Sequence, residues 1–328
     1  MRTQILLASL FCASVVGFAQ QKTGQLANIT RITNDAEVKY ENPRFSPDGN
    51  KVAFTMFGYE GLYVADRQAN NAVKQISADE GVGYMYQWSA DGSEILCRKV
   101  RHVQSANGFP RTYNIQTVDV KTKKATVLSN DGGSELRPAA WRYNSRGEAS
   151  VVADGRVIRS GLVRPAIKNA TVNASGAKVV IAQPAYKTSF ITDFEYLWAV
   201  DENGAKKVIY EGPALCPALS PDGKQVAFCD MESNVLVMSV KGGKATVIGK
   251  GFNPSWANNT QIVVEQTSDN GHDYLAGDLH MLNVKDKTDV ALTRTPGRIE
   301  MNPCVSPDGK KIAFTSFDDG QVYIADFE

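Results

Sequence analysis

Residues that could catalyse a reaction or hold a metal are scarce in this chain. Its three histidines, His102, His272 and His280, do not stand at a familiar zinc-ligand spacing. His280 occupies the position that Tyr63 and Tyr323 fill in strands of similar sequence, which predicts a packed or edge histidine. His102 and His272 lie in or beside long connecting segments, and two such histidines do not make a site. We therefore expect no catalytic residues, no metal and no cofactor.

The cysteines form no metal-binding or redox motif. No two of them stand as CxxC, and Cys216 and Cys229 would lie on neighbouring strands of one hairpin. An exported chain permits disulfides, so a bond between these two stays open as an alternative. We expect buried free cysteines, which behave as small hydrophobic residues. The cysteines beyond the N-terminal segment are Cys97, Cys216, Cys229 and Cys304.

Carboxylates recur in the tetrapeptide SPDG, at Asp48, Asp222 and Asp308. Proline suits the second position of a type I turn, aspartate accepts local backbone hydrogen bonds, and glycine supplies the positive φ that closes a hairpin. We therefore expect a structural role for the three aspartates. The Gly-rich stretches 131–135 and 241–243 lack a following lysine and helix, so they do not predict phosphate binding.

Aromatic and charged side chains gather in the segments that precede or join the predicted strands. Aromatic and arginine side chains on protruding segments are typical of a recognition surface. An alternative is that half of the aromatics only pack their segments onto the fold and that Arg137 pairs with Glu135. The long connections are 99–113, 184–196 and 267–277. The residues assigned to ligand or partner binding are Tyr40, Glu41, Tyr84, Tyr86, Phe109, Glu135, Arg137, Tyr186, Phe190, Tyr274 and Glu300.

A repeated sequence predicts the scaffold that positions these residues. NPRFSPDGNKVAF (42–54), CPALSPDGKQVAF (216–228) and NPCVSPDGKKIAF (302–314) are nearly the same. Apolar residues alternate or run together on both sides of each turn, for example at Val52 and Phe54. Each copy therefore predicts a strand, a tight turn and a second strand.

Weaker copies occupy the intervals at 86–97, 137–152, 169–182 and 253–264. The copies lie about 43 residues apart on average, which is the period of a four-stranded β-propeller blade. We predict an all-β fold, a single β-propeller with seven four-stranded blades. The third repeat is short, and merging it into a neighbour leaves six blades as the alternative.

The two ends of the repeat array complement each other. The last repeat stops after its third strand, VYIAD (322–326), whereas the array begins with ANITRIT (27–33), a fourth strand with no repeat before it. We predict that the N-terminal strand completes the last blade and closes the ring, which removes two exposed sheet edges.

Composition indicates an ordinary globular protein. The chain is 43% hydrophobic and 22% charged, with a formal net charge of +1. Such a balance generates no overall field that would attract nucleic acid or an anionic membrane. Basic residues also do not interleave with aromatics along a strand, as RNA-binding sheets require. We therefore expect no nucleic-acid partner.

The N-terminus predicts export. MRTQILLASLFCASVVGFAQ has one positive charge, an apolar run and the small residues Gly17 and Ala19 at a cleavage-site spacing, which is typical of a secretory signal peptide. The apolar run is too short for a comfortable membrane span. We expect residues 1–19 to be a signal peptide and 25–328 a propeller domain without a membrane span. A lipid anchor at Cys12 and an uncleaved anchor helix are the alternatives.

The SPDG-containing repeats resemble the TolB-like, PD40 (WD40-like) propellers of bacterial envelopes over nearly all of residues 25–328. The resemblance implies a periplasmic location, with secretion as the alternative. TolB, as the family is known, joins an α/β domain to a six-bladed propeller and works in the Tol–Pal system. No α/β domain is predicted before these repeats, so a role in the Tol system does not follow.

Other relatives of such repeats suggest further activities. Peptidases with similar propellers carry an α/β-hydrolase domain and a GxSxG elbow, and neither is found here. The repeats also resemble metal-dependent oligogalacturonate lyases, which gather several histidines at the channel mouth. We expect a non-enzymatic, monomeric propeller that binds an envelope protein, peptide or glycan through its long-loop face. A polysaccharide lyase or hydrolase acting at the channel mouth is the alternative.

Overall fold

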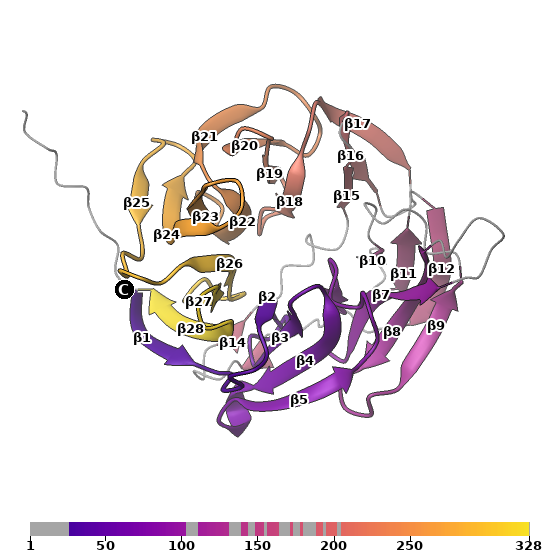
Figure 1. Ribbon diagram of the computed structural model, residues 1–328. Helices are drawn as coiled ribbons and strands as arrows, with labels where there is room; N and C mark the ends of the chain where they lie inside the picture. Colours follow the sequence, from indigo (N-terminus) through magenta and orange to yellow (C-terminus); the bar gives the residue numbers. More distant parts are fainter. Residues whose placement is uncertain are drawn as a thin grey trace, which may run out of the picture.

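The computed structural model is an all-β ring (Figure 1). Seven blades follow one another in chain order among the described residues, which confirms the predicted propeller and the predicted blade number. No described helix is long and apolar enough to cross a membrane. The described residues are 26–102, 111–130, 139–143, 148–153, 156–163, 171–172, 178–179, 188–192, 195–201 and 205–327. The predicted signal peptide lies outside them.

Five of the described sheets have four strands, and each runs antiparallel from the innermost strand outward. Their strands are β2 (Tyr40–Phe45), β3 (Lys51–Met56), β4 (Glu60–Asp66) and β5 (Ala72–Ser77) in blade 1; β6 (Gln87–Trp88), β7 (Glu94–His102), β8 (Arg111–Asp119) and β9 (Ala125–Ser129) in blade 2; β18 (Leu215–Leu219), β19 (Gln225–Cys229), β20 (Asn234–Ser239) and β21 (Thr246–Lys250) in blade 5; β22 (Phe252–Asn258), β23 (Gln261–Asp269), β24 (Tyr274–Asn283) and β25 (Asp289–Ala291) in blade 6; and β26 (Glu300–Val305), β27 (Lys311–Ser316), β28 (Gln321–Phe327) and β1 (Leu26–Arg31) in blade 7.

Blades 3 and 4 have three described strands each, and a short hairpin lies between them in the sequence. A 3-10 turn, Arg67–Ala69, follows β4. The strands are β10 (Ala140–Tyr143), β11 (Glu148–Ala153) and β12 (Arg156–Val163) in blade 3; β15 (Ser189–Thr192), β16 (Tyr196–Val200) and β17 (Lys206–Glu211) in blade 4; and β13 (Thr171–Val172) and β14 (Lys178–Val179) in the hairpin. The weak copy at 169–182 therefore contains the predicted hairpin, but the described sheet of blade 4 starts at β15.

The SPDG turns have the predicted structural role. In blade 1 the Ser46 hydroxyl donates to Asp48 at 2.6 Å and accepts from the backbone N–H of Lys51 at 2.9 Å, while Gly49 has a φ of 71°. The same serine-to-aspartate bond occurs at Asp222 and Asp308. The aspartate oxygens are therefore engaged in closing the hairpins.

The innermost strand contains a β-bulge at the dipeptide Xaa-Pro that precedes the turn. In four blades the residue preceding proline is left-handed, and the register then gains one extra residue relative to the neighbouring strand. These residues are Asn42, Cys216, Asn253 and Asn302, with φ values of 53°, 50°, 50° and 55°. The bulges therefore recur as a feature of the repeat.

The apolar core lies between successive blades. For example, Leu62 and Val64 of blade 1 pack with Trp88 and Ile95 of blade 2. Some inter-blade contacts are also hydrogen-bonded, because the indole N–H of Trp88 donates to the Arg44 carbonyl at 3.1 Å. Each blade therefore buries its faces against its neighbours around the ring.

The ring closes as predicted. β1 pairs antiparallel with β28, and the backbone N–H of Ile32 donates to the Val322 carbonyl at 2.9 Å. Gln321 also donates to the Val38 carbonyl at 3.0 Å. The first described strand of the chain thus becomes the outer strand of the last blade (Figure 1).

A candidate recognition face

Two sets of connections share one face of the propeller. In an antiparallel four-stranded blade, the turn between the second and third strands lies at the same end as the segment that enters the next blade. The structure joins them directly: the Phe57 N–H donates to the Lys39 carbonyl at 2.8 Å, and the Gly83 N–H donates to the Tyr59 carbonyl at 3.1 Å. We call this end the connection face; the SPDG turns lie at the opposite end.

The long connections on this face are mostly extended hairpins. β7 continues to His102 and β8 begins at Arg111, while β23 and β24 are paired as far as Asp269 and Tyr274. Within the remaining predicted connection, 184–196, residues 189–192 form β15, the first strand of the described blade 4 sheet. The segments 99–113 and 267–277 were expected to be loops, but strand pairing continues into both of them.

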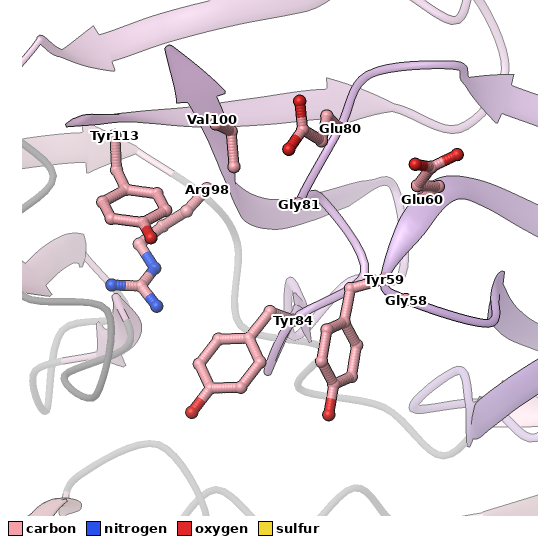
Figure 2. A pocket seen from close by; sticks show the side chains of 9 residues that line it. All are labelled: Gly58, Tyr59, Glu60, Glu80, Gly81, Tyr84, Arg98, Val100 and Tyr113. Carbon is pink, nitrogen blue, oxygen red and sulfur yellow. The ribbon is translucent and has the colours of Figure 1, made fainter. Parts of the chain in front are cut away.

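A cavity of about 140 Å³ lies on the connection face between blades 1 and 2 (Figure 2). Tyr59 reaches it from the β3–β4 turn, Tyr84 from the segment leading into β6, and Arg98 and Tyr113 from β7 and β8. The lining residues are Gly58, Tyr59, Glu60, Glu80, Gly81, Tyr84, Arg98, Val100 and Tyr113.

The aromatic side chains of the cavity form a connected group. The rings of Tyr59 and Tyr84 meet edge to face with centroids 5.1 Å apart. The guanidinium carbon of Arg98 lies 5.4 Å from the Tyr84 ring centroid and 4.9 Å from that of Tyr113, within cation–π range. Figure 2 shows the Tyr59 and Tyr84 rings side by side, with the Glu60 and Glu80 carboxylates on another side of the cavity. Aromatic faces and carboxylates therefore occur together in one small concavity.

The segment 79–86 is held closely against both blades. The backbone N–H of Val100 donates to the Glu80 carbonyl at 2.9 Å, and Lys99 forms a 2.6 Å ion pair with Asp79. A Cβ at Gly83 would lie 2.0 Å from the Thr55 hydroxyl oxygen, so only glycine fits there. The position of Tyr84 thus depends on contacts between residues far apart in the sequence.

Charged groups around the cavity are placed by similar contacts. Glu41 accepts a hydrogen bond from the Tyr59 N–H at 3.2 Å, and burial raises the pKa of its carboxyl group. His102 lies 2.8 Å from Glu80 through its Nε2 atom. Burial and then the nearby Glu41 raise the pKa of Tyr59, so its hydroxyl is neutral and can donate a hydrogen bond.

The structure places the predicted binding residues in different environments. Tyr84 lines the cavity, Glu41 supports it, and Tyr274 is exposed in blade 6 with its ring centroid 5.2 Å from that of Phe317. Phe190 is half-buried and packs against the core shared by blades 4 and 5. Phe109, Glu135, Arg137 and Tyr186 lie outside the described residues.

Three other predicted residues are buried. Tyr40 packs with Phe54 at a centroid distance of 5.1 Å, and the Tyr86 hydroxyl donates to the Asn42 carbonyl at 2.7 Å. Glu300 is 1% exposed at the junction of blades 6 and 7. Tyr86 and Tyr84 thus stand two residues apart, one in the core and one in the cavity.

Glu300 belongs to a buried acid group. The Thr293 hydroxyl accepts from the Leu279 N–H at 2.9 Å and lies 3.3 Å from oxygens of both Asp278 and Glu300. A hydroxyl has one proton, so it donates to one carboxylate at a time and the other contact requires a protonated carboxyl. Burial raises the pKa of Glu300 to about 7. When Glu300 is protonated, the Thr293 hydroxyl can therefore form hydrogen bonds with both Asp278 and Glu300.

Tyr59, Arg98 and Tyr113 were not identified from the sequence. Tyr59 stands in the short turn FGYE, and Arg98 and Tyr113 lie inside strands whose pattern indicated packing. Gly58 and Gly61 on either side of Tyr59-Glu60 are the sequence signal that could have marked this turn, in which Tyr59 has a φ of 65°. Both remaining histidines were placed as expected: His280 lies in β24 with Nδ1 2.6 Å from Asp289, and His272 is exposed.

Comparison with known proteins gives partial sequence matches. No family profile matches the chain. It is 27% identical over 151 residues to a protein named TolB homolog from Chlorobium chlorochromatii, and 29% identical over 121 residues to a TolB homolog from Chlorobium luteolum. The chain resembles TolB. These matches confirm the TolB-like resemblance of the repeats, over 43% and 34% of this chain.

The matches cover only a minor part of the length of the two TolB homologs. The chain spans 33% of the length of the first TolB homolog and 26% of the second. The activity and partners of the whole TolB homologs therefore do not transfer to this chain.

Solved structures show a related fold. The β-propeller domain of Cps50 (Swd1) from Myceliophteria thermophila matches 93% of this chain and 100% of that domain, with a TM-score of 0.58 and 10% identity. TolB from Acinetobacter baumannii, with a TM-score of 0.44 and 16% identity, matches 90% of this chain and 56% of its own. An oligogalacturonate lyase from Vibrio parahaemolyticus, with a TM-score of 0.45 and 16% identity, matches 93% and 96%. The first match supports the propeller fold and nothing about activity.

Proposed function

We propose that this chain is an exported, non-enzymatic propeller that binds a protein, peptide or glycan through its connection face. In this proposal residues 1–19 are removed as a signal peptide and the remaining chain acts as a monomer in the periplasm, without a cofactor. The observation that carries the proposal is the cavity of about 140 Å³ in which Arg98 lies over the rings of Tyr84 and Tyr113 and the Tyr59 ring meets that of Tyr84.

The chemistry of this cavity suits recognition. Tyrosine offers a rigid apolar ring and a polar end, which is why it is enriched where proteins bind ligands. The nine lining residues include no histidine, cysteine or serine, so the cavity offers no familiar pairing of a nucleophile with a base. Ring contacts and hydrogen bonds from its tyrosines would instead orient a ligand.

A ligand screen with matched variants tests the proposal. The chain without residues 1–19 is screened against displayed peptides and an array of envelope and plant oligosaccharides, as wild type and as Tyr59→Ala/Tyr84→Ala. We expect the selected ligands to lose about tenfold or more in affinity for the double variant. Val127→Ser, which alters an exposed residue of the outer strand β9, is the control and should bind normally.

The alternative function has its own readout in the same experiment. Incubation with polygalacturonate would release unsaturated uronate ends if the chain were a lyase. Such release, or ligands that bind the Tyr59→Ala/Tyr84→Ala variant as tightly as wild type, would overturn the proposal.

A further inference from the structure

The most exposed large apolar side chains of the described residues lie on the connection face. Phe57, Leu275 and Met231 are 67%, 63% and 61% exposed, and all three stand in or beside the turn between the second and third strands of a blade. Other exposed apolar residues, such as Val127 and Val247, lie on outer strands and are less than half exposed. Apolar exposure is therefore greatest on the face that carries the cavity, and such exposure marks interaction surfaces.

Two of these side chains, Leu275 and Phe57, belong to a series of neighbouring residues that runs across four blades. The Tyr274 ring of blade 6 lies 5.2 Å from the Phe317 ring of blade 7, and the ammonium group of Lys39 lies 4.9 Å from the Phe317 centroid. The Lys39 carbonyl then accepts the Phe57 N–H at 2.8 Å, which leads into the cavity between blades 1 and 2. We call this path the aromatic track; it consists of Tyr274, Leu275, Phe317, Phe57, Tyr59 and Tyr84.

The backbone of the track is held by hydrogen bonds. β23 and β24 remain paired up to Asp269 and Tyr274, and Gly277 bridges to Ile299 of blade 7. The Phe317 N–H donates to the Ile299 carbonyl at 2.8 Å. Presenting these apolar groups therefore needs little ordering of the backbone, which favours binding.

The surroundings of the track are acidic. The six segments 33–39, 57–60, 78–86, 267–277, 294–299 and 317–320 contain nine Asp and Glu residues against three Lys and Arg. Three more bases lie against these segments, because Lys99 pairs with Asp79, Arg31 pairs with Asp319 and Arg98 lines the cavity, which still leaves three more acids than bases. Of the basic residues, Lys39 already lies over the Phe317 ring and Arg298 over the Tyr323 ring. A face with this charge attracts a basic partner and repels an acidic one.

We infer that the aromatic track binds an extended basic peptide segment of a partner protein, whose apolar side chains cover the track while its Lys and Arg residues meet the surrounding acids. This inference rests on the proposed function and narrows its ligand to one class. An acidic glycan such as a polyuronate would be repelled by the excess of carboxylates around the track. Two copies of this chain would likewise bring like charges together.

Synthetic peptides test the inference directly. An extended peptide that alternates Lys with Leu or Trp is compared with one in which Glu replaces Lys and one in which Ser replaces Leu and Trp. Binding to the chain without residues 1–19 is followed by fluorescence anisotropy. We expect binding of the first peptide, weakened by added salt, and at least about tenfold weaker binding of the other two.

Variants locate the site. Phe57→Ser/Leu275→Ser should weaken the basic peptide about tenfold or more, whereas Val127→Ser/Val247→Ser, a matched change of exposed apolar residues on outer strands, should not. Unchanged thermal unfolding shows that each variant is folded. Equal binding of the Lys and Glu peptides, or no effect of the track variant, overturns the inference.

Two further outcomes separate this inference from the proposed function. If oligosaccharides bind and depend on Tyr59 and Tyr84 while the basic peptide does not bind, the peptide inference is wrong and the proposed function stands. If neither peptides nor oligosaccharides bind, both are wrong. Sedimentation of the chain alone distinguishes a second copy as occupant, since a dimer lost in the track variant also contradicts the inference.

Discussion

Two tyrosines of one connecting segment, Tyr84 and Tyr86, lie in different environments. Tyr84 lines a cavity while Tyr86 is 1% exposed, although both belong to the same connecting segment. The difference arises because the Tyr86 hydroxyl reaches the Asn42 carbonyl of the preceding blade, whereas the Tyr84 ring meets Tyr59. A residue's role here is therefore decided by its partner on another blade.

The buried acid Glu300 makes stability depend on pH. Its pKa is raised by burial from an ordinary value near 4.5 to about 7, so the folded state binds its proton more tightly than the unfolded state does. The stabilisation from this group is present below about pH 4.5 and is lost as pH rises through about 7. The neighbouring Asp278 raises the pKa in the same direction, and Arg298 opposes it.

We expect Glu300→Gln to flatten this part of the pH profile. The variant should gain about 1 to 2 kcal/mol relative to wild type between about pH 5 and about pH 8, after allowance for screening by solvent. Urea unfolding at the two pH values measures the change. Glu37→Gln, which alters an exposed carboxylate, is the control, and an equal gain in both variants would contradict the account.

The SPDG glycine Gly309 should be sensitive to any side chain. Its φ is 69°, and a Cβ would lie 2.7 Å from the Ala257 carbonyl oxygen of the preceding blade. We expect Gly309→Val to lower the free energy of unfolding by about 1 to 3 kcal/mol or more, as judged by urea unfolding. Peptide binding at the opposite end should be retained in the folded variant.

Gly297→Val is the matched control for the glycine experiment. Gly297 has a φ of 72°, but no atom lies within 4 Å of the place that a Cβ would occupy, so its variant carries only the backbone strain. The difference between the two variants measures the clash with blade 6. If the two lose equal stability, the close approach at Gly309 has no energetic effect.

At the scale of elements, turns were easier to predict from the sequence than binding residues. The SPDG turn could be predicted from its own residues, because Ser46 and Asp48 form hydrogen bonds with each other and with the backbone of the same turn. Tyr59 and Arg98 depend on Glu41, Tyr84 and Tyr113, which belong to other strands or another blade. No local pattern encodes those contacts, so their placement required the assembled ring.

The connecting segment 79–86 offers an element-scale test. Gly83→Ala would place a methyl group 2.0 Å from the Thr55 hydroxyl oxygen, so the segment must move and Tyr84 with it. We expect basic-peptide affinity to fall by about tenfold while the ring stays folded. Gly243→Ala is the control, because Gly243 has open space around it and lies in the turn between β20 and β21, away from the connection face. Unchanged affinity in Gly83→Ala would show that the position of Tyr84 does not matter for binding.

At the scale of the whole molecule, ring closure by β1 joins the two ends of the described chain. Deleting residues 25–34 from the chain without its signal peptide would leave the outer edge of β28 unpaired and remove Ile32 from the core between blades 7 and 1. We expect a clearly lower melting temperature and aggregation through the exposed edge, measured by calorimetry and light scattering. A deletion variant that melts like the parent would contradict closure by this strand.

The whole-molecule arrangement was largely predictable because the repeat is encoded many times. Bulges at Asn42 and Asn302 and the turn at Gly223 recur with the same backbone geometry, so errors at one copy are corrected by the others. Blade 4 is the exception. Its weak copy at 169–182 forms the separate hairpin of β13 and β14, while β15 lies within a segment expected to be a loop.

The central claim is that the connection face, along the aromatic track, is where this propeller binds its ligand. Hydrogen–deuterium exchange of the chain without residues 1–19, with and without the basic peptide, tests it most directly. We expect the peptide to slow exchange in segments 57–60, 79–86, 270–275 and 317–320 and to leave the SPDG turns at 46–50 and 306–310 unchanged. Protection confined to the SPDG turns, or spread evenly around the ring, would contradict it.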